Sequence, residues 1–169
     1  MSGSLVAIYT AAASRAPVSA QDAIQVRMGC GIVGDRHFRA RGYAEGAPPN
    51  QITLIEQEAV DDFNTRHGVS VTNGELRRNL VTRSIDLNAL VGKIFAVGEV
   101  RLRGIELCEP CVVIGKLLQR PSLSPAQVVR AWVGHGGLRA EILDDGVIRV
   151  GDAIIADSGQ RPAGEAPTG

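Results

Sequence analysis

The stretch that decides the fold class runs from Lys93 to Leu107 and reads KIFAVGEVRLRGIEL. Two β-rich runs, residues 93–98 and 100–107, meet at Gly98-Glu99, a pair that is typical of a hairpin turn. In the second run apolar residues alternate with charged ones, as in a strand with one buried face. The stretch therefore predicts two neighbouring antiparallel strands.

Further short strands are expected on both sides of this hairpin. Short β-rich runs bounded by turn residues occupy positions 5–9, 51–55, 138–143, 147–150 and 152–156. The last three runs are separated by Asp-Gly and Gly-Asp pairs, which are typical of tight turns. We expect these three strands to form a meander, in which consecutive strands pair with each other.

Helical patterns are fewer than strand patterns. Residues 56–67 place apolar side chains at helical spacing behind acidic first turns, and residues 112–120 do so directly after Pro110. Because proline is common just before or at a helix start, the second helix should begin at or near Cys111. Ser124-Pro125 is typical of another helix start. Many short strands with few helices predict a mainly β protein, either a barrel or a sandwich.

Composition narrows the class of function. The 169 residues contain 18 basic and 18 acidic side chains and only 4% aromatic residues, which argues against nucleic acid as the main partner. No run approaches the ~20 apolar residues of a membrane span, and the N-terminus lacks the basic region of a secretory signal. We expect one cytoplasmic domain over residues 1–157 and a disordered tail over residues 158–169.

The cysteines are the sharpest chemical signal. Three cysteines, at positions 30, 108 and 111, argue for reduced thiols rather than a disulfide scaffold. The run Cys108-Glu109-Pro110-Cys111 allows four interpretations: half of a zinc site, a redox pair, a single reactive thiolate at Cys111, or two buried apolar fillers. A helix start at Cys111 would favour its ionised form, suited to a nucleophile or a soft metal ligand.

Two polar motifs accompany the cysteines. Gly34-Asp35-Arg36-His37 places an acid, a base and an imidazole on consecutive positions, which fits either an anion-binding turn or a solvated turn. Arg77-Arg78-Asn79 offers forked donors beside an amide, suited to phosphate or pterin heteroatoms, although surface salt bridges explain the arginines equally well. Glycines 29, 31 and 34 fit a dinucleotide fingerprint only superficially, because no helical pattern follows them.

Taken together and in order, the motifs resemble the MOSC domain family, named after the C-terminal domain of molybdenum cofactor sulfurase. The segments that carry the resemblance are residues 31–37, 50–60, 74–82, 85–104, 108–111 and 134–152. The resemblance implies a closed, mostly antiparallel β-barrel of the pyruvate-kinase-barrel type with a few short helices. It also implies the molybdenum-pterin cofactor.

The resemblance assigns roles to particular residues. The cysteine matching Cys111 ligates molybdenum in reductase members and is proposed to carry sulfur in sulfurase-linked ones. The family's Arg-x-Asn segment maps onto Arg77 and Asn79, which would hold the pterin phosphate or groups near the metal. The remaining candidates would line the cofactor pocket, and they are Glu56, Glu109, Pro110, Asp35 and His37.

Three functions stay open. The first is a reductase of small N-hydroxylated compounds with Cys111 as metal ligand, and since the sequence has no flavin or iron-sulfur motif, a separate electron-donor protein would supply the electrons. The second is a sulfur carrier that receives a persulfide on Cys111 from a cysteine desulfurase. The third is a small-ligand binding module that kept the barrel and lost activity.

Overall fold

The computed structural model describes residues 1–47 and 50–156, and these form a mainly β structure with three short α-helices. The strands are β1 (Ser2–Thr10), β2 (Ser19–Gln21), β3 (Ala23–Arg27), β4 (Gly31–Ile32), β5 (Ile52–Glu56), β6 (Leu80–Arg83), β7 (Ile94–Val97), β8 (Val100–Leu107), β9 (Leu138–Ile142), β10 (Gly146–Arg149) and β11 (Ala153–Ala156). The helices are α1 (Gln57–His67), α2 (Val112–Leu118) and α3 (Pro125–Trp132), with single 3-10 turns at η1 (Asn73–Leu76) and η2 (Asn88–Leu90). The tail predicted over residues 158–169 lies outside the described residues.

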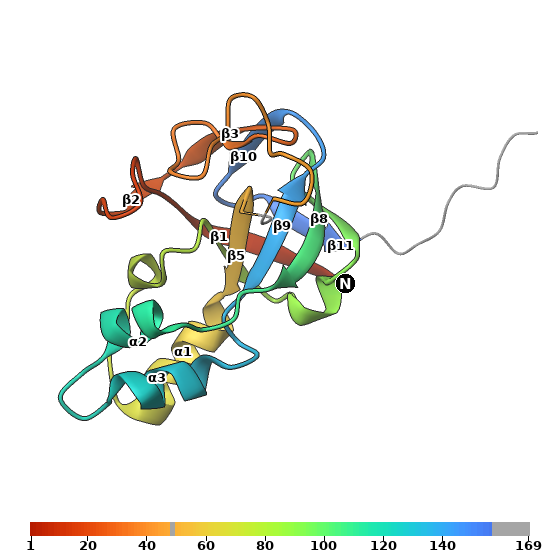
Figure 1. Ribbon diagram of the computed structural model, residues 1–169. Helices are drawn as coiled ribbons and strands as arrows, with labels where there is room; N and C mark the ends of the chain where they lie inside the picture. Colours follow the sequence, from red (N-terminus) through yellow and green to blue (C-terminus); the bar gives the residue numbers. More distant parts are fainter. Residues whose placement is uncertain (48–49, 157–169) are drawn as a thin grey trace, which may run out of the picture.

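Seven strands close into a barrel (Figure 1). Their order is β11-β7-β8-β9-β5-β6-β1, and β1 pairs with β11 to complete the ring, while β2 continues the sheet beyond β1. Neighbours are antiparallel except β5 and β6, which are parallel because α1 and η1 carry the chain back from the end of one to the start of the other. The predicted closed and mostly antiparallel barrel is confirmed.

The predicted hairpin lies in this ring, whereas the predicted meander is wrong. β7 and β8 pair around Gly98-Glu99 as expected. The last three strands do not pair with one another: β9 lies between β5 and β8, β10 pairs with β3 beside β4 in a second sheet, and β11 closes the barrel. Asp145 contributes to this pairing of β10 with β3. Its carboxylate accepts a hydrogen bond from the Met28 amide at 2.7 Å and so connects the turn before β10 to the β3–β4 hairpin. Turn residues indicate where the chain reverses direction, but they do not determine which strands pair with each other.

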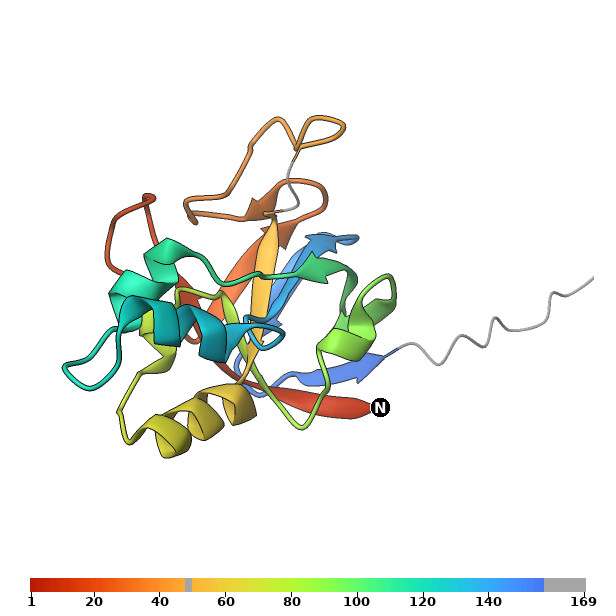
Figure 2. The same ribbon diagram turned by 60° about the horizontal axis from the view of Figure 1, so that its bottom comes forward.

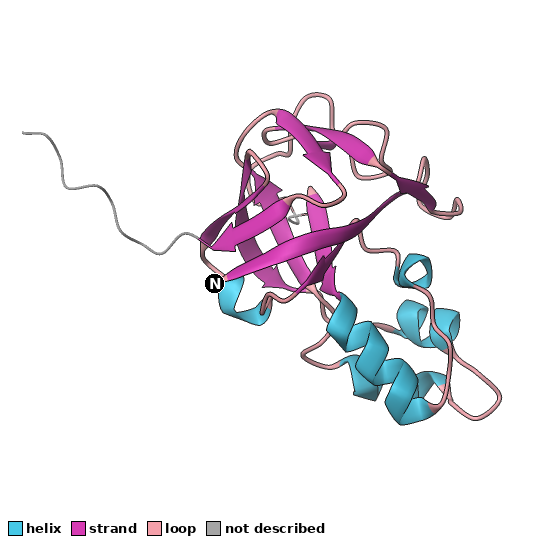
Figure 3. Cartoon of the chain, turned by 180° about the vertical axis from the view of Figure 1, so that it is seen from behind, coloured by secondary structure: helices cyan, strands magenta, loops and turns pink. Residues whose placement is uncertain are grey.

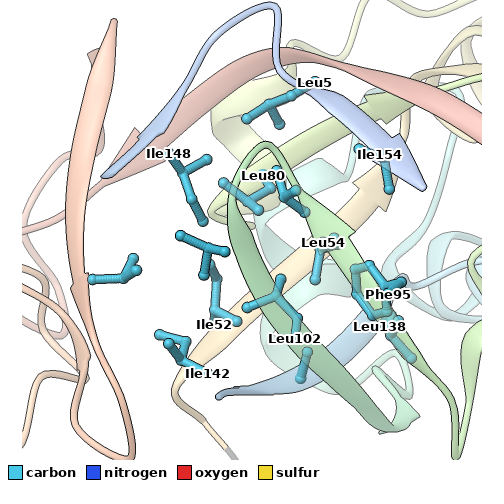
Figure 4. Packing of buried hydrophobic residues seen from close by; sticks show 14 of the residues in the cluster. Leu5, Ile52, Leu54, Leu80, Phe95, Leu102, Leu138, Ile142, Ile148 and Ile154 are labelled. Atoms are coloured by element: carbon cyan, nitrogen blue, oxygen red, sulfur yellow. The ribbon is translucent and has the colours of Figure 1, made fainter. Parts of the chain in front are cut away.

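Aliphatic side chains fill the barrel (Figure 4). The buried residues labelled there come from every strand of the ring and from β10, and they are Leu5, Ile52, Leu54, Leu80, Phe95, Leu102, Leu138, Ile142, Ile148 and Ile154. Along β8 the buried residues alternate with Arg101 and Arg103, which pair with Asp144 and Glu141 on the outer face. The alternation expected from the sequence is confirmed, and the barrel is a packed core.

The helices gather at one end of the barrel (Figure 3). There they share a second apolar cluster that includes Phe63 of α1 and Trp132 of α3, whose rings lie 5.0 Å apart. Figures 1 and 2 both show α2 and α3 side by side. All three helices begin within a residue of the predicted starts, and Ser124 caps α3 by accepting a hydrogen bond from the Gln127 amide at 3.3 Å. Within residues 1–47 and 50–156, no helix has the length and apolar character that crossing a membrane requires.

Candidate functional site

Cys111 lies where the chain leaves the barrel and enters the helical layer. β8 ends at Leu107, residues 108–110 form the connection, and Cys111 is the extended N-cap residue of α2, with φ −127° and ψ 173°. Its thiol is free and exposed. The predicted helix start at Cys111 is therefore confirmed, and the sulfur is accessible to other molecules.

A pocket of about 190 Å³ opens beside this thiol. Four of its lining residues are arginines drawn from three separate parts of the chain: Arg36 from the loop after β4, Arg77 and Arg78 from the connection between η1 and β6, and Arg139 from β9. The other lining residues are Leu76, Glu109, Cys111, Val113, Ile114 and Leu117. The fold therefore brings one cysteine and four arginines from separate parts of the chain to one pocket.

Backbone carbonyls hold the first two of these arginines. Arg77 adopts the left-handed conformation, with φ 57°, and its guanidinium donates to the carbonyls of Ala16 at 2.9 Å and Ser14 at 3.0 Å. Arg36 donates to the Arg77 carbonyl at 2.8 Å and pairs with Asp35 at 3.4 Å. Burial lowers the pKa of Arg36, the Asp35 carboxylate opposes this, and the charges of the neighbouring arginines lower it further. The pocket wall is thus a crowded cationic surface.

The other two arginines attach the pocket to the barrel end. Arg78 donates from Nε to the Gly136 carbonyl at 2.9 Å, and Arg139 pairs with Glu106 at 2.7 Å. Among the described residues no carboxylate forms a salt bridge with Arg77 or Arg78. Two positive charges beside the thiol are therefore left uncompensated, which suits an anionic ligand.

A close chain crossing fixes the position of this wall. A side-chain carbon added at Gly136 would collide with the backbone carbonyl of Cys108, and one added at Gly137 would collide with that of Leu54. The Cys108 amide donates to the Gly137 carbonyl at 2.7 Å across the same crossing. The segment Gly134-His135-Gly136-Gly137 has a composition typical of a flexible loop, but it packs tightly against β5 and the end of β8.

Cys108 differs sharply from Cys111, although it lies only three positions earlier. Its side chain is 2% exposed, and burial raises the pKa of its thiol, partly opposed by the nearby charges of Arg78 and Arg139. Both thiols are free. No three His, Cys, Asp or Glu side chains cluster as metal ligands in the part of the chain that the structure describes.

Some of the predicted site residues meet in the pocket and others do not. Cys111, Arg77 and Glu109 line it, whereas Pro110 adjoins it without being among the lining residues. Asn79 is 2% exposed and lies in the barrel wall: its side chain accepts from the Thr53 amide at 3.1 Å and donates to the Tyr9 carbonyl at 3.1 Å. These bonds join β1 and β5 to the residue that directly precedes β6, and the side chain has almost no exposed surface.

The remaining predicted residues, Glu56, Asp35 and His37, are not among those that line the pocket. Glu56 caps a turn elsewhere by accepting from the Leu87 amide at 2.7 Å, and burial raises its pKa. Asp35 is buried, and its carboxylate accepts from the amides of Ala11 at 3.0 Å and His37 at 3.1 Å. Burial and the charge of the adjacent arginine lower the pKa of His37. Asp35 still supports the pocket, since it holds Arg36.

Sequence reasoning did not select three of the four pocket arginines. Arg36 and Arg78 lie inside motifs that were singled out, but as neighbours of the chosen residues, and Arg139 follows the glycine run. The signal that could have found these arginines is their position in the sequence, since each lies in or next to a glycine-containing or polar motif. The sequence does not indicate which of these segments lie beside Cys111 in the folded chain.

The fold and this pocket define a class: a small mainly β barrel that presents an exposed thiol among arginines at one end. The family model described as the MOSC domain matches residues 41–155, which is more than half of the chain. The chain therefore belongs to the MOSC domain family. No curated protein matches it.

Solved structures share the fold. The YuaD protein from Bacillus subtilis is 23% identical with a TM-score of 0.80, and the match covers 95% of this chain and 98% of that one. YiiM from Geobacillus stearothermophilus is 17% identical with a TM-score of 0.65, covering 92% and 75%. YiiM from Escherichia coli is 14% identical with a TM-score of 0.63, covering 96% and 72%.

Proposed function

We propose that this MOSC protein binds the molybdenum-pterin cofactor through Cys111 and reduces small N-hydroxylated compounds. The observation that carries the proposal is that the exposed Cys111 and four arginines line one pocket. Membership of the MOSC family makes this cofactor the first candidate for such a pocket.

The donor chemistry fits this cofactor. A thiolate is a soft ligand, of the kind that thiophilic metals select, and forked guanidinium groups suit phosphate and pterin heteroatoms. Arg77 and Arg78 are the best anchors because, within the part of the chain that the structure describes, their guanidinium groups donate to backbone carbonyls and to no carboxylate. At about 190 Å³ the pocket is smaller than the roughly 300–1,000 Å³ of sites that enclose a whole ligand, so a cofactor held here would stay partly exposed.

The bound cofactor would supply the two-electron chemistry, and the chain would supply its setting. Cys111 would hold the metal, and the arginines would neutralise the negative charge of the cofactor. Among the described lining residues Glu109 carries the one carboxylate, and it is the group placed to pass a proton from solvent to a leaving hydroxide. A separate electron-donor protein completes the proposal.

Metal and pterin analysis tests this function. The chain is produced in a host that makes the cofactor, and molybdenum and pterin are measured per chain in wild type, Cys111→Ser and the matched control Cys108→Ala. We expect close to one of each in wild type and in the control, and neither in Cys111→Ser, which also loses amidoxime reduction. Wild-type protein that contains no molybdenum from such a host contradicts the proposal.

A second function is favoured by the openness of the site. Cys111 is exposed, and its pocket is large enough for a persulfide without any cofactor. As a sulfur carrier, the Cys111 thiolate would attack the outer sulfur of a desulfurase persulfide, forming a new sulfur-sulfur bond while the desulfurase cysteine leaves as a thiolate. Mass spectrometry after incubation with a cysteine desulfurase and cysteine would then show one added sulfur atom on Cys111 and none on Cys108.

A further inference from the structure

We propose that the groove between α2 and α3 docks a partner protein that presents an apolar side chain surrounded by carboxylates, which identifies the kind of surface expected on the electron donor. The groove is lined by Val112, Pro125, Ala126, Val129 and Arg130 and has a volume of about 500 Å³. The inference rests on the proposed function, because only a protein that exchanges electrons or sulfur at Cys111 needs a partner there.

Apolar side chains are exposed on α2 to an unusual degree. Val112 is 65% exposed, Val113 64% and Leu117 44%, while Ile114 and Leu118 of the same helix are buried against the cluster beneath. Single exposed valines are ordinary on a protein surface. On this short helix Val112 lines the groove, while Val113 and Leu117 line the neighbouring arginine pocket, so together they form an exposed apolar surface of the kind that marks an interaction site.

The groove is already formed without a partner. A side-chain carbon added at Gly115 would lie 2.8 Å from the Pro125 carbonyl oxygen, so the two helices pack with their backbones close together. The reciprocal capping of Ser124 and Gln127 fixes the start of α3. A partner side chain would therefore enter rigid walls, which lowers the entropy cost of binding.

Charge identifies the occupant as acidic. Arg130 lines the groove and is exposed, and Lys116 is exposed on α2. A second copy that docked through the same face would bring Arg130 and Lys116 against their own counterparts, so an acidic partner fits better than a symmetric dimer.

Position connects the groove to the chemistry. Val112 directly follows Cys111, and Val113 and Leu117 of the same helix line the arginine pocket. A partner anchored in the groove would therefore cover the mouth of that pocket. This brings its donor group next to the sulfur, as electron or sulfur transfer requires.

The test uses the full chain and synthetic peptides, so it does not depend on bound molybdenum. Amide NMR spectra are recorded while a hexapeptide is added that carries Leu-Phe between two acidic residues on each side. A second peptide has lysines in place of the acidic residues. Ala126→Glu and Ala126→Lys introduce long side chains of opposite charge at one exposed groove position, and Val147→Ser alters an exposed valine on the second sheet.

The acidic peptide should shift the amides of residues 112–118 and 125–132, and the basic peptide should not. Ala126→Glu should weaken the acidic peptide about tenfold, whereas Ala126→Lys and Val147→Ser should bind it within about threefold of wild type. Four results would each overturn the proposal. They are equal binding of both peptides, chemical-shift changes only outside these two helices, undiminished binding of the acidic peptide by Ala126→Glu, and a dimer that buries the groove. Absence of molybdenum in the metal analysis would overturn the proposed function separately.

Discussion

Cys108 and Cys111 are separated by two residues and occupy opposite environments. Cys108 continues the barrel: it is 2% exposed and its amide is bonded across the chain crossing at Gly137. Cys111 begins a helix outside the barrel, exposed and lining a pocket with four arginines. The difference shows that two cysteines close in sequence need not act as a redox pair. Here the chain leaves the end of β8 between them, so that one thiol is buried and the other is exposed.

The largest effect is expected at the glycine that seals Cys108. Gly136→Ala would drive a methyl group into the Cys108 carbonyl, and because the contact is backbone, the crossing has to open. We expect the free energy of unfolding to fall by about 3 kcal/mol or more. Denaturant unfolding measures this. Gly134→Ala is the comparison position with open space around it, although its positive φ adds some strain of its own, so its loss should be clearly smaller.

The next largest effect is expected at Asn79, and it distinguishes a structural role from a cofactor role. Asn79→Ala leaves the Thr53 amide and the Tyr9 carbonyl without their side-chain partners inside the barrel wall. Unpaired buried groups cost about 1–3 kcal/mol each, so stability should drop by about 2 kcal/mol or more. Unchanged stability together with loss of the pterin would instead support a direct role in cofactor binding.

Much of the fold follows from local sequence signals. The β7–β8 hairpin, α1 and the starts of α2 and α3 are set by turn residues, helical spacing and caps, which act between neighbours in the chain. The closure of β11 between β7 and β1, and the pairing of β10 with β3, depend on contacts between distant segments, which turn residues do not encode.

The candidate site was predictable in its centre but not in its wall. Cys111 was identified because its neighbours predict a helix start, and Arg77 because the resemblance selects it. Arg139 reaches the pocket only because β9 lies beside β8 in the barrel. Asn79 and Arg77 belong to one motif in the sequence, yet Asn79 directly precedes β6 and its side chain is bonded inside the barrel wall.

A smaller effect is expected at Cys108 itself. Cys108→Ala removes one buried sulfur, which should cost about 1 kcal/mol and leave a small cavity. Reactions of Cys111 should be nearly unchanged. Equal losses of activity in Cys108→Ala and Cys111→Ser would contradict the difference between the two thiols. They would support the interpretation that Cys108 and Cys111 act as a redox pair.

The smallest effect concerns alkaline pH. Burial raises the pKa of Cys108 above its ordinary 9.0, so the unfolded chain loses this proton at a lower pH than the folded chain does. The stability from the neutral thiol is therefore complete below pH 9 and is lost as the pH rises through the folded pKa. Wild type should lose more stability than Cys108→Ala between pH 8 and alkaline conditions. Parallel pH curves would contradict burial of this thiol.

The most direct test of an accessible sulfur in a cationic pocket is the rate at which each cysteine of the native chain is alkylated by neutral iodoacetamide and by anionic iodoacetate, followed by mass spectrometry. Cys111 should react first with both reagents. Its rate with iodoacetate relative to iodoacetamide should exceed that of a free cysteine peptide, and it should fall in Arg78→Gln and in high salt. Labelling of Cys108 as fast as Cys111, or a ratio equal to that of the free peptide, would contradict the account.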